Sequence, residues 1–166
     1  MNRETVFGGG RVHRSVLWRE FDLANRDRYL NVIGLNPSTA DETRDDPTIR
    51  RCIGFAKAWG SGALCMTNAY AYRATKPADM FAALDPVGAF NDHWLLECAG
   101  AASMALAAWG SNILPARRAQ LCCLFRDISV NCLGVTASGE PRHPLYIRAD
   151  MRPQVWLPIE QLAQTG

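Results

Sequence analysis

An apolar segment that runs directly into a turn of small polar residues constrains this chain most. Residues 29–33, Tyr-Leu-Asn-Val-Ile, have the composition of a buried parallel strand. The run stops at Gly34, and Pro37 cannot donate to a sheet ladder, so the chain must turn there. Ligand crevices of open α/β folds form where such strands end. The segment therefore predicts a strand that carries Asn36 and Ser38 to the carboxyl edge of a sheet.

An ordinary strand-to-helix turn would have the same pattern, but three later segments repeat it. Apolar runs end at Asn68, at Trp109-Gly110 and before the polar loop 139–146. Predicted strands cover 29–34, 63–68, 103–110 and 130–135, and predicted helices cover 47–59, 91–100 and 115–125. This alternation predicts an α/β fold with a central, mostly parallel four-stranded sheet between helices. The polar strand ends should then gather at one edge of that sheet.

The chain is expected to form a single domain over residues 1–166, with its core in about 29–147. Two short runs around Gly8-Gly9-Gly10 predict an N-terminal β-hairpin within residues 1–20. Asp46 fits the N-cap of the first helix, and Asn91 with Asp92 fits the cap of the second. The end of the chain, around 158–164, has the pattern of a short helix.

Composition excludes several classes of protein. Hydrophobic residues make up 48% of the 166 residues, and no apolar run approaches a membrane span. The N-terminus lacks the apolar core of a secretory signal, so a cytoplasmic location is expected. The six cysteines form no C-x-x-C pair and fit small buried residues rather than metal ligands. We therefore expect no metal and no membrane association.

The basic residues are almost all arginines rather than lysines. Lys57 and Lys76 are the only lysines among 18 basic residues, and the rest are arginines. Arginine suits bidentate contacts with phosphate, although a coding bias toward G and C produces the same preference. The net charge of +2 is too small to indicate nucleic-acid binding by itself.

Four short motifs, taken in order, resemble those of the uracil-DNA glycosylase superfamily. They are Gly34-Leu-Asn-Pro37, Thr67-Asn68, Ala108-Trp109-Gly110 and His143-Pro-Leu-Tyr146. The match spans about residues 29–147, and the fuller runs at 36–40, 46–51 and 139–146 look most like a microbial and phage branch, a domain of unknown function. The resemblance implies a three-layer α/β/α sandwich and a site at the strand ends. It implies no metal or organic cofactor.

The resemblance also implies roles for three side chains. His143 would donate a hydrogen bond to the departing base, although it also fits a structural loop histidine. Asn36 stands where stronger enzymes of the superfamily have Asp, and it would orient water because an amide cannot accept a proton as a carboxylate does. Asn68 would read the edge of the base. One of Asp41, Asp45 and Asp46 is a candidate for the missing carboxylate, and the helix cap is the simpler interpretation of Asp46.

Other residues would surround the base or contact DNA. Gly34, Leu35 and Pro37 would lie beside the base, and Tyr70 would stack on it, with Tyr72 and Phe55 as alternatives. Leu145 and Tyr146 would enter the duplex, where relatives insert an apolar wedge. The predicted DNA or phosphate contacts are Ser38, Thr39, Arg50, Arg51, Arg142, Leu145 and Tyr146, with Arg73 and Arg148 as further candidates.

These assignments predict an enzyme that hydrolyses the N-glycosidic bond of a damaged, mismatched or modified base in DNA, acting as a monomer on single- or double-stranded substrate. Two alternatives stay open. The same crevice would serve a module that recognises a nucleobase without cutting, which the amide of Asn36 and the small net charge favour. It would also serve a hydrolase of free nucleosides or nucleotides.

Overall fold

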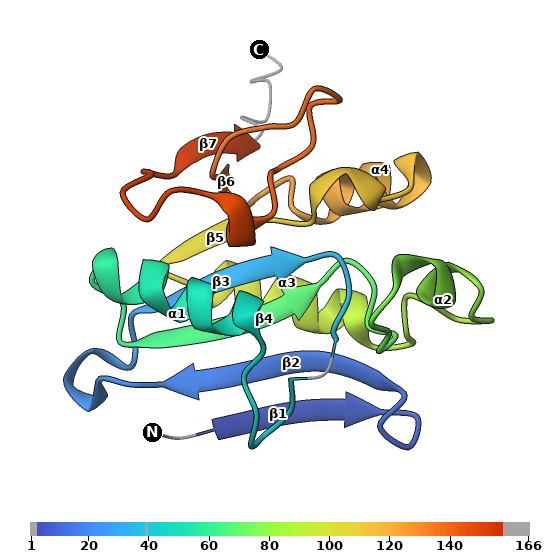
Figure 1. The fold of residues 1–166 in the computed structure, drawn as a ribbon, viewed down its shortest axis with the longest axis horizontal. Helices are drawn as coiled ribbons and strands as arrows, with labels where there is room; N and C mark the ends of the chain where they lie inside the picture. The colour runs from blue at the N-terminus through green and yellow to red at the C-terminus, as the bar shows by residue number, and fades with distance from the viewer. Residues whose placement is uncertain (1–2, 39, 158–166) are drawn as a thin grey trace, which may run out of the picture.

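Short apolar runs form the strands of one mixed sheet, and the helices pack on it (Figure 1). The computed structural model describes residues 3–38 and 40–157. Seven strands lie in this part of the chain: β1 (Arg3–Gly8), β2 (His13–Glu20), β3 (Tyr29–Gly34), β4 (Ala63–Asn68), β5 (Met104–Ala107), β6 (Val130–Cys132) and β7 (Gln154–Leu157). The four α-helices are α1 (Pro47–Ala58), α2 (Pro77–Phe81), α3 (Asn91–Ala101) and α4 (Pro115–Leu124). Three 3-10 helices are η1 (Leu23–Asn25), η2 (Gly110–Asn112) and η3 (Pro144–Tyr146).

The strands lie in the order β1-β2-β4-β3-β5-β6-β7. β3 pairs in parallel with both β4 and β5, and β5 pairs in parallel with β6. β1 and β2 form the predicted N-terminal hairpin, which joins the sheet because β2 pairs antiparallel with β4. β7 pairs antiparallel with β6 at the other edge and was not predicted. The predicted α/β class is confirmed, and the sheet is mixed and has seven strands.

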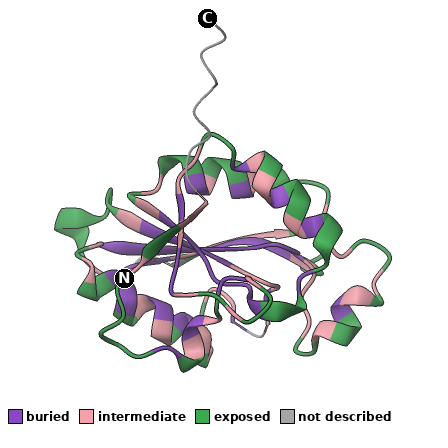
Figure 2. Ribbon diagram, turned by 90° about the horizontal axis from the view of Figure 1, so that it is seen from above, coloured by how far each residue is buried: buried purple, intermediate pink, exposed green. Residues whose placement is uncertain are grey.

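Alternating side chains of the central strands fill two cores, one on each face of the sheet. Leu30 and Val32 of β3 pack with Ile49 of α1 in the first core. Ile33, one residue further along β3, packs with Leu95 of α3 in the second. Figure 2 shows the buried residues of the sheet lying between helices on both sides. Burial on both faces explains why these strands are continuous apolar runs.

The predicted bounds of α1, α3 and α4 agree with the structure to within one residue, and the predicted cap of α1 is confirmed but that of α3 is not. Asp46 caps α1, because its Oδ1 accepts a hydrogen bond from the backbone N–H of Ile49 at 2.8 Å. The prediction that Asn91 and Asp92 cap α3 is wrong, since Phe90 occupies the N-cap position without a side-chain hydrogen bond. Asn91 is buried instead, and its Nδ2 donates to the carbonyl of Asn68 at 2.9 Å. In sequence, an asparagine at the start of a helix looks the same whether it caps the helix or is buried against a neighbouring strand.

Two strands are shorter than predicted, and one helix was not expected. β5 ends at Ala107 and β6 at Cys132, because the residues that follow leave the sheet to line a cavity or enter loops. The short helix α2 begins at Pro77, in a segment for which no element was predicted. The predicted helix at 158–164 lies outside the described residues.

Candidate functional site

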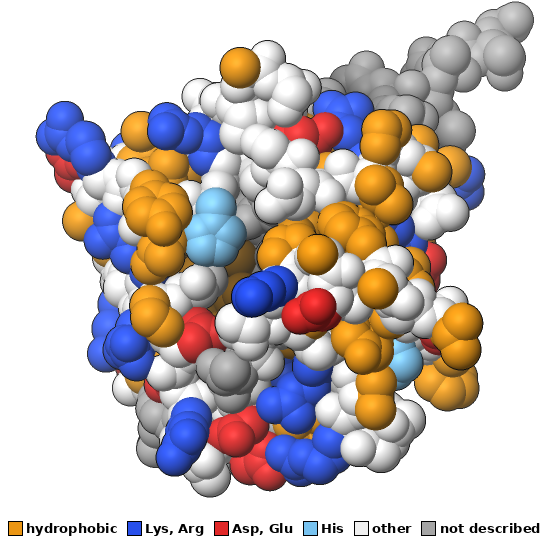
Figure 3. Space-filling model, turned by 45° about the vertical axis from the view of Figure 1, so that its right-hand side comes forward, with side chains coloured by type: hydrophobic (Ala, Val, Ile, Leu, Met, Phe, Trp, Pro, Cys, Tyr) orange, Lys and Arg blue, Asp and Glu red, His pale blue; other side chains and the backbone are white. Residues whose placement is uncertain are grey.

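A cavity of about 510 Å³ opens at the carboxyl ends of β3, β4 and β5. Gly34 and Asn68, the last residues of β3 and β4, are paired directly across the two strands. The chain after β5 and the loop before η3 complete the walls. The predicted site residues that line it are Gly34, Leu35, Asn36, Ser38, Asn68 and His143. Figure 3 brings this side of the molecule forward and shows basic and acidic side chains interspersed on it.

Asn68 is a buried amide held at the end of β4. Its backbone carbonyl oxygen accepts the hydrogen bond from Nδ2 of Asn91, which ties α3 to the strand end. The Nδ2 group of Asn68 is buried and has no hydrogen-bond partner among the described residues. An unpaired buried amide is unfavourable, so this group is ready to bind an acceptor atom of a ligand.

Gly34 leaves the space that the Asn68 amide occupies. A Cβ atom at position 34 would lie 2.7 Å from Oδ1 of Asn68, which is closer than van der Waals contact allows. The glycine of the Gly-Leu-Asn-Pro motif therefore has a packing reason to lack a side chain.

We expect Gly34→Ala to displace the Asn68 amide and to lower the free energy of unfolding by about 1–3 kcal/mol, the usual cost of overpacking. Urea denaturation measures this change. The matched control is Gly54→Ala in α1, where an added Cβ meets no atom within 4 Å and should stabilise the helix by up to about 1 kcal/mol. Equal stability changes in both variants would contradict the proposed clash.

The side chain of Asn36 is oriented by two backbone carbonyls. Its Nδ2 donates to Ala74 at 2.8 Å and to Pro37 at 3.1 Å. Both contacts require a donor, so they identify which end of the amide is nitrogen. Oδ1 makes no hydrogen bond with the described residues and is therefore available as an acceptor, for example for the proton of a water molecule.

His143 lies in the loop before η3, which two contacts attach to the end of β5. The indole Nε1 of Trp109 donates to Glu140 at 2.9 Å, and the backbone N–H of Gly110 donates to Pro141 at 2.8 Å. Nδ1 of His143 accepts a hydrogen bond from the backbone N–H of Leu145 at 3.3 Å. In the neutral ring the proton is then on Nε2, which is a hydrogen-bond donor.

Burial lowers the pKa of His143 below its ordinary value of 6.5, and the negative charge of Asp46 opposes this effect. The unfolded chain therefore takes up a proton at a pH where the folded protein does not. We expect the contribution of His143 to stability to be complete above about pH 6.5 and to be lost as the pH falls toward the lowered pKa. Thermal unfolding between about pH 5 and 8 should show a shallower acid decline in His143→Gln. Equal slopes in the two proteins would contradict this.

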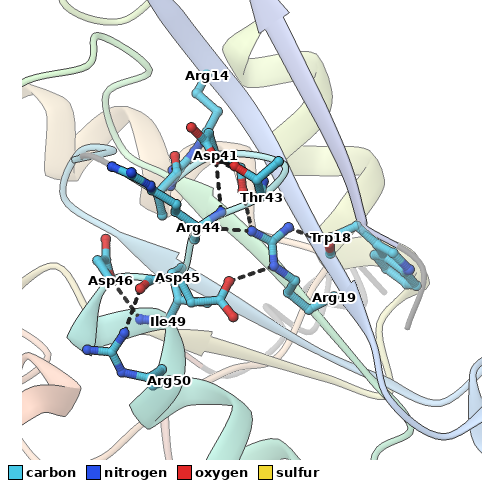
Figure 4. Close-up of polar contacts among 11 residues, drawn as sticks. Arg14, Trp18, Arg19, Asp41, Thr43, Arg44, Asp45, Asp46, Ile49 and Arg50 are labelled. Atoms are coloured by element: carbon cyan, nitrogen blue, oxygen red, sulfur yellow. Dashed lines mark hydrogen bonds and ion pairs between the residues drawn. The ribbon is translucent and has the colours of Figure 1, made fainter.

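Only one of the three candidate carboxylates lines the cavity. Asp41 accepts hydrogen bonds from Thr43 and Arg44, which lower its pKa to about 2. Asp45 forms an ion pair with Arg19 at 2.7 Å (Figure 4). Asp46 caps α1, as predicted, and also lines the cavity. Of the three carboxylates, Asp46 is therefore the one placed to act on a ligand in the cavity.

Several predicted residues lie away from the cavity walls. Tyr70 is buried in the second core, where its hydroxyl accepts a hydrogen bond from the N–H of Leu114, so it offers no face to a ligand in the cavity. Phe55, its alternative, is buried in the first core. Tyr72, the other alternative, packs edge-on against His13. Pro37 is buried but is not part of the lining.

The predicted DNA contacts lie mainly on the surface. Leu145 and Tyr146 belong to η3, directly after His143, and Tyr146 is exposed. Arg50 and Arg142 are exposed, whereas the guanidinium of Arg51 covers the ring of Phe55. Thr39 lies outside the described residues.

Sequence reasoning missed Arg14, which lines the cavity from β2. Its position in a hairpin that precedes every motif carried no signal of a role in the site. The described residues contain no group of three or more His, Cys, Asp or Glu side chains arranged to hold a metal ion. None of the described helices is long and apolar enough to span a membrane.

The fold and the site define an α/β protein with a cavity of mixed polar and apolar lining at the carboxyl ends of its parallel strands. Residues 14–145 match a family model described as "Protein of unknown function (DUF1643)". The match covers most of the chain and includes every lining residue of the cavity, so the chain belongs to this family. No curated protein and no solved structure matches the sequence.

Proposed function

We propose that the cavity binds a nucleobase and that the protein is a DNA glycosylase-like hydrolase of a damaged, mismatched or modified base. The observation that carries this proposal is the grouping of three side chains around one cavity. Asn68 has an unpaired amide donor, Asn36 a free acceptor and His143 a ring nitrogen that donates. These are the groups that base recognition, water orientation and leaving-group stabilisation require.

In this proposal the Asn68 amide binds the edge of a flipped base. Water held by Oδ1 of Asn36 attacks C1′ of the sugar as the bond between C1′ and the base nitrogen breaks. The bonding electron pair leaves with the base, and the Nε2–H of His143 stabilises the negative charge on its oxygen. The water oxygen forms the new bond to C1′, and the proton that the water loses balances the protonation of the released base. Asp46 is the carboxylate in the cavity that is available to assist that proton.

The resemblance to the uracil-DNA glycosylase superfamily supports the same proposal. The proposal includes the three-layer arrangement of that superfamily, around a four-stranded parallel sheet. It also includes a monomeric enzyme that acts in the cytoplasm. Leu145 and Tyr146 would enter the duplex beside the cavity, while Ser38, Arg50 and Arg142 would contact phosphates. Arg51 covers a core aromatic ring and is a weaker candidate for such a contact.

The test uses labelled single- and double-stranded oligonucleotides that contain uracil, mismatched thymine, deaminated purines or bulky modified pyrimidines. Alkali reveals abasic sites as strand breaks. We expect breaks at one class of base, and we expect them to be absent with Asn36→Ala and with His143→Ala. Breaks that persist in both variants would contradict the assigned site.

Recognition of a base without cleavage is the second candidate, and the amide at position 36 favours it. An amide orients water but does not accept its proton. If no oligonucleotide in the panel is cut and DNA binding weakens steeply with salt, recognition becomes the better description.

A further inference from the structure

Among the described residues, three arginine side chains are almost completely buried, and they are not equally paired. The exposed fractions are 2% for Arg14, 0% for Arg19 and 4% for Arg117. Nε of Arg19 forms an ion pair with Asp45 at 2.7 Å, and Nη2 of Arg117 forms one with Asp92 at 2.5 Å. Arg14 forms no ion pair with any carboxylate of residues 3–38 and 40–157. It is also the one of these three that lines the cavity.

Arg14 is hydrogen-bonded only in part. Its Nη1 donates to the carbonyl of Ala40, while its buried Nε has no partner within the described part of the chain. Burial lowers its pKa to about 10, so the guanidinium is still cationic at neutral pH. Asp46 and Asp41 attract this charge without contacting it, and Arg73 and Arg19 repel it.

We propose that Arg14 binds an oxyanion of the ligand, either a phosphate or a carboxylate, inside the cavity. Burying a cation is unfavourable unless an opposite charge compensates it, and guanidinium groups match the geometry of both oxyanions. Nδ2 of Asn68 is a second buried donor without a partner in the same cavity, so one ligand with several acceptor atoms satisfies both groups. The inference extends the proposed function, because it assigns an anionic group to the substrate of that cavity.

A purely structural role for Arg14 predicts a different outcome on mutation. If Arg14 only supports the loop through Ala40, Arg14→Met should lower the melting temperature. If the charge is kept for a ligand, Arg14→Met should leave the melting temperature of the free protein unchanged or raise it, because replacing an uncompensated buried charge by an apolar side chain is favourable.

Isothermal titration with four probes tests binding: uracil, 5-carboxyuracil, uridine 5′-monophosphate and inorganic phosphate. We expect an anionic probe to bind about 10- to 100-fold more weakly to Arg14→Met, which is the loss typical of a hydrogen bond to a charged group. The affinity for uracil should change much less. Preference for 5-carboxyuracil would place the anion on the base, and preference for the nucleotide or for phosphate would identify a phosphate. Arg126→Met is the matched control, since this exposed residue lies outside the cavity and forms an ion pair with Asp127 at 3.6 Å.

The inference is overturned if no anionic probe binds the wild-type protein, if Arg14→Met binds every anionic probe as tightly as wild type, or if Arg14→Met is destabilised. Its failure is distinguishable from failure of the proposed function. Base release that depends on His143 but not on Arg14 would support the hydrolase and contradict the anion site. Anion binding that depends on Arg14, in a protein that neither binds nor releases any base, would support the anion site and contradict the hydrolase.

Discussion

Replacing His143 by alanine is expected to reduce the rate of base release by about 10²- to 10⁴-fold, the usual contribution of a positioned proton donor. Its Nδ1 accepts a hydrogen bond from the N–H of Leu145, so the neutral ring carries its proton on Nε2, and the residue lines the cavity. In the proposed mechanism, that donor stabilises charge that develops on the base only as the bond breaks. DNA affinity should therefore change by no more than a few-fold. Single-turnover rates and equilibrium binding on the same oligonucleotide separate the two effects.

The matched control is His93→Ala, on the exposed face of α3 outside the cavity. It removes the same ring and should retain wild-type rates. If both variants retain full activity, His143 is a structural loop residue. If His143→Ala loses binding together with turnover, its contact is with the bound substrate and not specifically with the transition state.

Replacing Arg19 by methionine is expected to lower the free energy of unfolding by about 3–5 kcal/mol, the cost of breaking a buried ion pair. Arg19 lies on β2 and organises the loop that leads to α1 (Figure 4). Its guanidinium donates to the carboxylate of Asp45 and to three backbone carbonyls, those of Trp18, Asp41 and Arg44. All of these acceptors lose their donor in the variant. Urea denaturation followed by circular dichroism measures the change.

Arg14→Met provides an unusually close comparison, because it is the same substitution of an equally buried arginine on the same strand. We expect the changes in the free energy of unfolding of the two variants to differ in sign or by several kcal/mol. Since Arg19 holds the loop that places Asp46 at the cavity, Arg19→Met should also weaken ligand binding at temperatures where it is folded. A loss below about 1 kcal/mol in Arg19→Met would mean that solvent replaces these contacts readily.

Local sequence patterns predicted the parts of the fold that depend on neighbouring residues. The apolar runs of β3 and β4 were placed at their observed bounds because both strands are buried on two faces. The bounds of α1 followed from Asp46 as a cap and from Gly60, whose φ of +76° suits a helix end. Polar residues directly after buried strands also indicated where Asn36 and Asn68 would lie.

Contacts between distant segments could not be predicted in this way. β7 is half exposed and pairs with β6 across more than twenty residues, so its short run carries no clear alternation. Asn91 has the sequence pattern of a cap, but the end of β4 offers it a buried carbonyl instead. Tyr70 follows Asn68 closely, yet its ring turns into the second core.

The sequence by itself determined the α/β class, the main strands and helices, and the edge of the sheet at which Asn36, Asn68 and His143 gather. These features follow from the period of apolar residues and from turn chemistry, which act over a few positions. Only the tertiary structure decided that Asp46, and neither Asp41 nor Asp45, lines the cavity, and that Arg14 lies there without a carboxylate partner. Burial and pairing of charges depend on which segments the fold brings together, and that information is not local.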